Sequence, residues 1–92
     1  MEKDIERYLR KKVKALGGLA PKWVSPGWDG APDRILLLPG GRVLFAETKD
    51  TGEKPSKKQL LRHQQLRDLG FIVTVPDSRT AVDNLLRGVA EE

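Results

Sequence analysis

Two short β-prone runs, residues 34–38 and 42–46, are separated only by a Pro-Gly-Gly turn at residues 39–41. This arrangement constrains the fold of the 92-residue chain more than any other stretch. Proline and glycine between two apolar runs are typical of a β-hairpin. If three residues form the loop, Leu38 faces Arg42, and this pair sets the register of the whole ladder.

The predicted register brings two carboxylates together. Counting down the ladder places Asp33 directly opposite Glu47, and directly paired residues have Cβ atoms roughly 4.5–5.5 Å apart. Both carboxylates could then hold one divalent cation at roughly 2.0–2.6 Å. Lys49 projects from the same face as Glu47, about 6.6 Å further along the strand. A change of one residue in loop length would instead put Asp33 opposite Thr48.

An acid-x-Lys pattern in a strand also occurs on an ordinary solvated sheet face, and this alternative stays open. Two neighbours favour the chemical interpretation. Glu47 ends the apolar run 43–46, which suggests a strand inside the fold, and Asp33 follows Pro32, whose ring fixes the backbone just before the strand begins.

The length predicts one small domain over residues 1–92, and a core of this modest size favours stabilisation by a homodimer. Seventeen Lys and Arg against thirteen Asp and Glu give a net charge of +4, which is compatible with a polyanionic partner without establishing one. The absence of cysteine excludes disulfides and thiolate metal sites. With no apolar run of membrane-spanning length and no signal-peptide pattern, we expect a soluble, cytoplasmic protein.

The pattern of apolar residues predicts an α/β fold, a small mixed sheet with flanking helices in the order α-β-β-β-α-β-α. The run at 71–75 reads as a buried strand, and we expect it to lie parallel to the strand that ends at Glu47, through a right-handed crossover. The expected elements are a helix over 3–16, a strand over 19–24, the hairpin strands, a helix from 57 to about 69, the strand 71–75 and a last helix capped by Asp77 or Ser78.

Three polar residues have two interpretations each. Glu6 sits at the edge of the apolar arc of the first helix, so it either borders the core or is an exposed acid among Lys and Arg. Gln59 either completes a capping box with Ser56 or reaches towards the metal site from the start of its helix. His63 is the only histidine, and we expect a surface or partly buried polar residue instead of a catalytic base.

Cationic and aromatic residues leave the position of a nucleic-acid surface open. Several cations near a helix N-terminus, whose free amides favour anions, make phosphate contact a credible addition to ordinary solvated surface. Trp23 and Trp28 either cover the edge of the core or stack on bases. The candidate DNA-binding cations are Lys54, Lys57, Lys58 and Arg62.

These motifs, in this order, resemble the PD-(D/E)xK nuclease superfamily, and within it the small stand-alone VRR-NUC domain of phages and bacteria. The resemblance extends from Glu6 to about Val75 and implies a restriction-endonuclease-like core in a bacterial or phage-infected cell. It rests on Glu6 in the first helix, Gly30-x-Pro32-Asp33, Glu47-x-Lys49 and Ser56-x-x-Gln59.

The resemblance implies Mg²⁺ or Mn²⁺ as the cofactor. By position, Asp33 and Glu47 would be ligands, joined by the backbone carbonyl of Thr48, and Glu6 would match the acid of the first helix that serves a second ion. The absence of Cys and of a His cluster independently argues against zinc and favours ions that prefer oxygen.

The resemblance also implies a DNA endonuclease that acts as a homodimer on branched DNA such as Holliday junctions. Lys49 would orient or deprotonate the attacking water, and Gln59 would steady the site. Two alternatives remain: a non-catalytic basic nucleic-acid-binding module, and a nuclease of the same fold that acts on linear duplex DNA or RNA.

Overall fold

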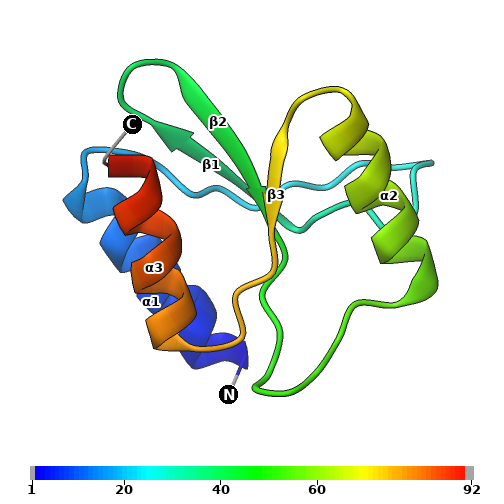
Figure 1. The fold of residues 1–92 in the computed structure, drawn as a ribbon, viewed down its shortest axis with the longest axis horizontal. Coiled ribbons are helices and arrows are strands. Elements are labelled where there is room, and N and C mark those ends of the chain that lie inside the picture. Colours follow the sequence, from blue (N-terminus) through cyan, green and yellow to red (C-terminus); the bar gives the residue numbers. More distant parts are fainter. Residues whose placement is uncertain (1, 91–92) are drawn as a thin grey trace.

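The computed structural model describes residues 2–90, in which three helices and three strands form a layered α/β structure (Figure 1). The predicted fold class and small mixed sheet are confirmed. Residues 1, 91 and 92 of the expected 1–92 domain lie outside the described residues. The elements are α1 (Glu2–Ala15), β1 (Arg34–Leu38), β2 (Arg42–Ala46), α2 (Lys57–Asp68), β3 (Ile72–Thr74) and α3 (Arg79–Ala90).

The hairpin has the predicted register. Strands β1 and β2 are antiparallel, and Leu38 pairs with Arg42 across a three-residue loop. Gly40 and Gly41 both have positive φ angles, +84° and +74°, which other residues rarely adopt. Strand β3 pairs with β2 in parallel, as predicted, so the sheet order is β1-β2-β3.

The sheet separates two apolar clusters, and helices cover both of its faces (Figure 1). Helices α1 and α3 pack on the face that carries Leu36 and Leu44, and the Tyr8 hydroxyl of α1 donates a 2.7 Å hydrogen bond to Asp83 of α3. Helix α2 packs on the other face, where Phe45 is buried. No helix within residues 2–90 is both long and apolar enough to cross a membrane.

The segment predicted as a strand over residues 19–24 pairs with β1 at only two isolated positions. Leu19 exchanges two backbone hydrogen bonds with Leu37, and Lys22 pairs with Arg34. Between these positions lies Pro21, which has no N–H to donate and therefore interrupts a regular ladder. The segment is extended and holds the outer edge of β1 without being a fourth regular strand.

Strand β3 is shorter and more exposed than predicted. It covers Ile72–Thr74 instead of 71–75, and both Phe71 and Ile72 are exposed. Because β3 lies at the edge of the sheet, it has a neighbouring strand, β2, on one side only, and its other side is not covered by the sheet. Val73 points into the α2 cluster and is the buried residue of the strand.

Gly30→Ala is expected to destabilise the protein by about 2 kcal/mol or more, because Gly30 has a φ of +85° and a Cβ there would lie 2.8–2.9 Å from Lys58. Gly27→Ala is the matched control. Its φ is +80° but nothing lies within 4 Å, so only the backbone strain of about 1 kcal/mol applies. Urea denaturation of the two variants measures the difference, and equal destabilisation would exclude a contact with α2.

Candidate functional site

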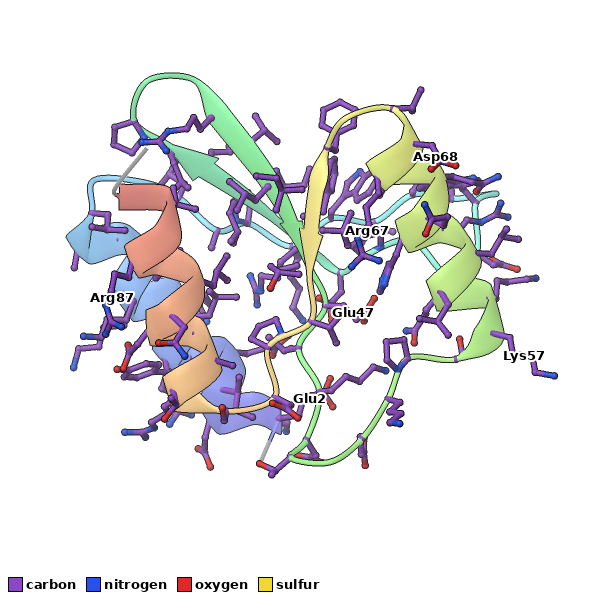
Figure 2. All side chains as sticks on the ribbon, in the orientation of Figure 1. Glu2, Glu47, Lys57, Arg67, Asp68 and Arg87 are labelled. Atoms are coloured by element: carbon purple, nitrogen blue, oxygen red, sulfur yellow. The ribbon has the colours of Figure 1, made fainter. Side chains whose placement is uncertain are left out.

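Asp33 and Glu47 lie one residue beyond the paired ends of β1 and β2. Continuing the observed register, in which Arg34 pairs with Ala46, places Asp33 opposite Glu47, on the sheet face that α2 covers. Backbone hydrogen bonds fix both residues beyond the ends of the strands. The Glu47 N–H donates to the Thr74 carbonyl (2.9 Å), and the Trp23 N–H donates to the Asp33 carbonyl (2.8 Å). Figure 2 shows Glu47 at the centre of the molecule, between the two helical layers.

Glu47 is an unusually basic carboxylate. Its side chain is buried, with a residue exposure of 4%, and burial is the largest cause that raises its pKa to about 7. The negative charge of Asp33 raises this pKa further, whereas the charge of Lys49 lowers it. The three side chains therefore interact in one place, as the hairpin register predicted.

The pKa of Asp33 is raised as well. Burial is again the first cause, followed by the negative charge of Glu6, while Arg34 lowers the pKa. Glu2 contributes a smaller negative charge to both Asp33 and Glu47. In Figure 2 Glu2 lies below Glu47, at the beginning of α1. The carboxyl groups of Glu2 and Glu6, both on α1, therefore interact electrostatically with the site.

Glu6 does not have the solvated environment of an ordinary surface acid. Its Oε1 lies 3.8 Å from Nη2 of Arg34, a buried arginine that also donates a 2.7 Å hydrogen bond to the Ala20 carbonyl. Glu6 is close enough to Asp33 to raise its pKa. Its proposed role at a second ion stays a prediction, because the observed partner of Glu6 is Arg34.

His63 is completely buried, which differs from the expectation of a surface or partly buried residue. Its Nε2 lies 3.7 Å from Glu47 Oε1. Burial first, and then the charges of Arg67 and Lys49, lower the pKa of His63, so the ring is neutral at pH 7. The contact is therefore between a neutral imidazole and a carboxyl group, which is not a salt bridge.

Gln59 completes a capping box at the start of α2. Its Oε1 accepts a 2.9 Å hydrogen bond from the Ser56 backbone N–H, and its own N–H donates to Ser56 Oγ at 3.2 Å. The routine structural interpretation of Gln59 is therefore realised, and a contact with the site stays a prediction. Thr48 is fully buried next to Glu47, and its Oγ1 has no hydrogen-bond partner in the described part of the chain.

The four candidate DNA-binding cations have different environments. Lys54 and Lys57 are exposed, and Figure 2 shows Lys57 directed away from Glu47. Lys58 Nζ lies 3.7 Å from Asp29, and Arg62 Nε donates a 2.8 Å hydrogen bond to the Asp29 carbonyl. Lys58 and Arg62 therefore anchor a loop to α2, and a contact of these cations with phosphate stays a prediction.

Trp23 and Trp28 lie at the edge of the α2 cluster. Their rings are 6.0 Å apart, and Trp23 packs 5.0 Å from the ring of Phe45. The Arg62 guanidinium lies 5.0 Å from the centre of the Trp28 ring. Both tryptophans therefore cover the edge of the core, which is the first of the two interpretations of their sequence positions.

The donor set fits an oxygen-preferring cation. Asp33 Oδ1 and Glu47 Oε1 are both buried and have no hydrogen-bond partner within residues 2–90, a costly condition that a cation would relieve. No group of three or more His, Cys, Asp or Glu in the same range is arranged around a metal position. Two carboxylates are sufficient for Mg²⁺, which completes its shell with waters, carbonyls and substrate phosphates.

Sequence reasoning missed Glu2 and His63 as parts of this site. A signal for His63 was present, because it lies four residues after Gln59 and three before Leu66, on the inward side of α2. Glu2 lies four residues before Glu6 and therefore shares its face of α1. Both signals become interpretable only when the helix faces are known.

The chain is similar to known proteins in sequence and in structure. It is 47% identical over 78 residues to "Putative nuclease p44" of Acyrthosiphon pisum secondary endosymbiont phage 1, which covers 85% of this chain and 84% of that protein. A solved structure described as "VRR_NUC domain" has a TM-score of 0.89 and 38% sequence identity, with 94% of both chains covered. No family model matches the chain.

Proposed function

The chain belongs to the VRR-NUC family of nucleases, and on this basis we propose that it is a Mg²⁺- or Mn²⁺-dependent DNA endonuclease. One observation carries the proposal. Two buried carboxylate oxygens, Asp33 Oδ1 and Glu47 Oε1, have no hydrogen-bond partner among the described residues, in a site to which Lys49 adds positive charge. Such a set is suited to a hard cation and a phosphate.

In this proposal Asp33, Glu47 and the backbone carbonyl of Thr48 hold the ion. A bound divalent cation would supply charge stabilisation at the phosphate and increase the acidity of water. Lys49 neutralises charge on the scissile phosphate and orients the attacking water. Gln59 steadies the start of α2 through its capping box. Glu6, which interacts electrostatically with Asp33, serves a second ion.

His63 supports the same site from α2. A neutral imidazole against Glu47 Oε1 restricts the orientation of that carboxylate, as outer partners of metal ligands commonly do. The pKa values of Glu47 and His63 are shifted in opposite directions, so the pair avoids two buried charges when no cation is present.

We propose branched DNA, such as a four-way junction, as the substrate and a homodimer as the active form. A two-fold dimer would present two sites to two strands of a symmetric junction. The exposed apolar residues Leu69, Phe71 and Ile72, in the turn after α2 and at the start of the edge strand β3, support self-association. The proposed location is the cytoplasm of a bacterial or phage-infected cell.

The test is a panel of linear duplex, flap, four-way junction and RNA substrates, each incubated with Mg²⁺, with Mn²⁺ and with EDTA. We expect metal-dependent cleavage of the junction in preference to the linear duplex, at a protein concentration where sedimentation detects the dimer. Preference for linear duplex or RNA would support a same-fold nuclease of another specificity. Binding of every substrate without cleavage under any condition would support the non-catalytic binding module.

A further inference from the structure

An open groove of about 700 Å³ lies between α1 and the segment that precedes β1. Its walls are one face of α1 and residues 18–21, and Arg34 closes its inner end. The groove is outside the carboxylate site, because Asp33 and Glu47 are not part of its lining. It is also separate from the candidate DNA-binding cations of the loop and α2.

The groove wall on α1 is cationic. Arg7, Arg10, Lys11 and Lys14 follow one another at spacings of three, one and three residues, which places them on one face of the helix. All four are exposed, and no acidic residue among the described ones lines the groove. The arrangement is an electrostatic surface suited to a polyanion.

The second wall of the groove is apolar. Leu19 is 65% exposed, and Ala20 and Pro21 complete the same wall. A cationic wall opposite an apolar wall fits a sugar-phosphate backbone, because phosphates meet the cations while the sugars contact carbon atoms. Contacts to phosphate and sugar make up most of the hydrogen bonds in protein–DNA interfaces.

Arg34 connects the groove to the carboxylate site. It follows Asp33 directly in the chain and lines the inner end of the groove, although only 4% of it is exposed. Its Nε has no hydrogen-bond partner in the described part of the chain, and the ion pair with Glu6 is long, at 3.8 Å. The Arg34 guanidinium, which is also paired with Glu6, therefore lies between the groove and Asp33, whose pKa its charge lowers.

The length of the cationic face matches a few base pairs. From Arg7 to Lys14 the helix rises about 10 Å, and one strand of DNA advances about 3.4 Å per nucleotide. The face begins one residue after Glu6 and runs away from the carboxylate site along α1. It could hold the backbone of about three successive nucleotides beside the reacting phosphate.

We propose that this groove binds the sugar-phosphate backbone of the duplex DNA arm next to the cleavage site. The inference rests on the proposed function, and it adds a DNA contact on α1 that is distinct from the loop and α2. The groove sets where the substrate arm lies, whereas the carboxylates act on the phosphate that reaches them.

The test is fluorescence anisotropy of a labelled 20-base-pair DNA duplex in EDTA, where no cleavage occurs, over a series of salt concentrations. Arg10→Gln combined with Lys14→Gln should weaken DNA binding about tenfold. It should also reduce the magnitude of the slope of log K against log salt concentration by about 2. Lys12→Gln combined with Arg87→Gln is the matched control. It removes one lysine and one arginine from a different hollow between α1 and α3, and should leave the slope unchanged.

Each outcome is decisive. Equal losses in both double variants would show that only net charge matters and would overturn the groove. If the groove variant binds DNA as tightly as the wild type, the inference about the groove is overturned. The proposed nuclease function would not be affected, because cleavage is measured separately. A loss of binding to anionic vesicles or to duplex RNA, with DNA binding unchanged, would assign the groove to another polyanion. Absence of any DNA binding by the wild type would overturn both proposals.

Discussion

Glu47→Gln is expected to lower the rate of metal-dependent DNA cleavage by about 1000-fold, or about 4 kcal/mol of transition-state stabilisation. The substitution keeps the shape of the side chain but removes the negative charge that would hold the cation. The reason lies in the geometry, because Glu47 is the buried partner of Asp33 and its Oε1 has no hydrogen-bond partner among the described residues. Single-turnover cleavage of the preferred DNA substrate measures the effect.

The matched control is Glu53→Gln, an exposed acid in the loop after the site. It removes the same charge from the same residue type, so it corrects for the change in net charge. We expect its cleavage rate to remain within about twofold of the wild-type rate. An unchanged rate in Glu47→Gln, with the circular dichroism spectrum of the folded protein, would exclude this site as the centre of the reaction.

The second large effect is on stability without metal. The pKa of Glu47 rises from its ordinary value of 4.5 to about 7 in the folded protein, and this difference corresponds to about 3 kcal/mol. Between pH 4.5 and about pH 7, Glu47 keeps its proton in the folded protein but has lost it in the unfolded chain. The contribution of Glu47 is therefore fully present below 4.5 and is lost as the pH rises through about 7. Glu47→Gln should be more stable than the wild type at about pH 8 by up to this amount.

Other titratable groups lie near Glu47, and their effects on the pH dependence of stability must be distinguished from its own. The raised pKa of Asp33 acts in the same direction, whereas the lowered pKa of His63 removes stability as the pH falls through 6.5. The charges of Lys49 and Glu2 also act on Glu47. The quantity to measure is thus the difference between wild type and Glu47→Gln, by urea denaturation in EDTA from about pH 5 to about pH 8.

A constant difference over that range would contradict the raised pKa of Glu47. Glu53→Gln is again the control and should follow the wild type within about 0.5 kcal/mol. Added Mg²⁺ should stabilise the wild type at about pH 8 and have little effect on Glu47→Gln, because only the wild type keeps both carboxylates.

The hairpin and its register were predictable because local chemistry determines them. Two glycines with positive φ close the turn, and a shift of the register by one residue would move Leu36 and Leu38 to the other face of the sheet. The capping box of Ser56 and Gln59 was predictable for the same reason, since all of its atoms lie within four residues.

The remaining parts depend on contacts between distant segments. Pairing of residues 19–22 with β1 is set by the position of β1 and by the missing donor of Pro21, so the apolar pattern alone suggested a regular strand. The burial of His63 depends on how α2 lies on the sheet. The ion pair of Glu6 with Arg34 joins residues 28 positions apart in the sequence, and no local sequence pattern predicts it.

The glycines at the hairpin tip have a consequence for how proteins with this domain could be enlarged. A Cβ added at Gly40 or Gly41 would meet nothing within 4 Å, so these two positions of the tip face open space. The apolar pairs Leu36–Leu44 and Ile35–Phe45 hold the strands in place independently of the tip. A whole accessory module could therefore be inserted at the tip, at the opposite end of the strands from Asp33 and Glu47, without disturbing the carboxylates.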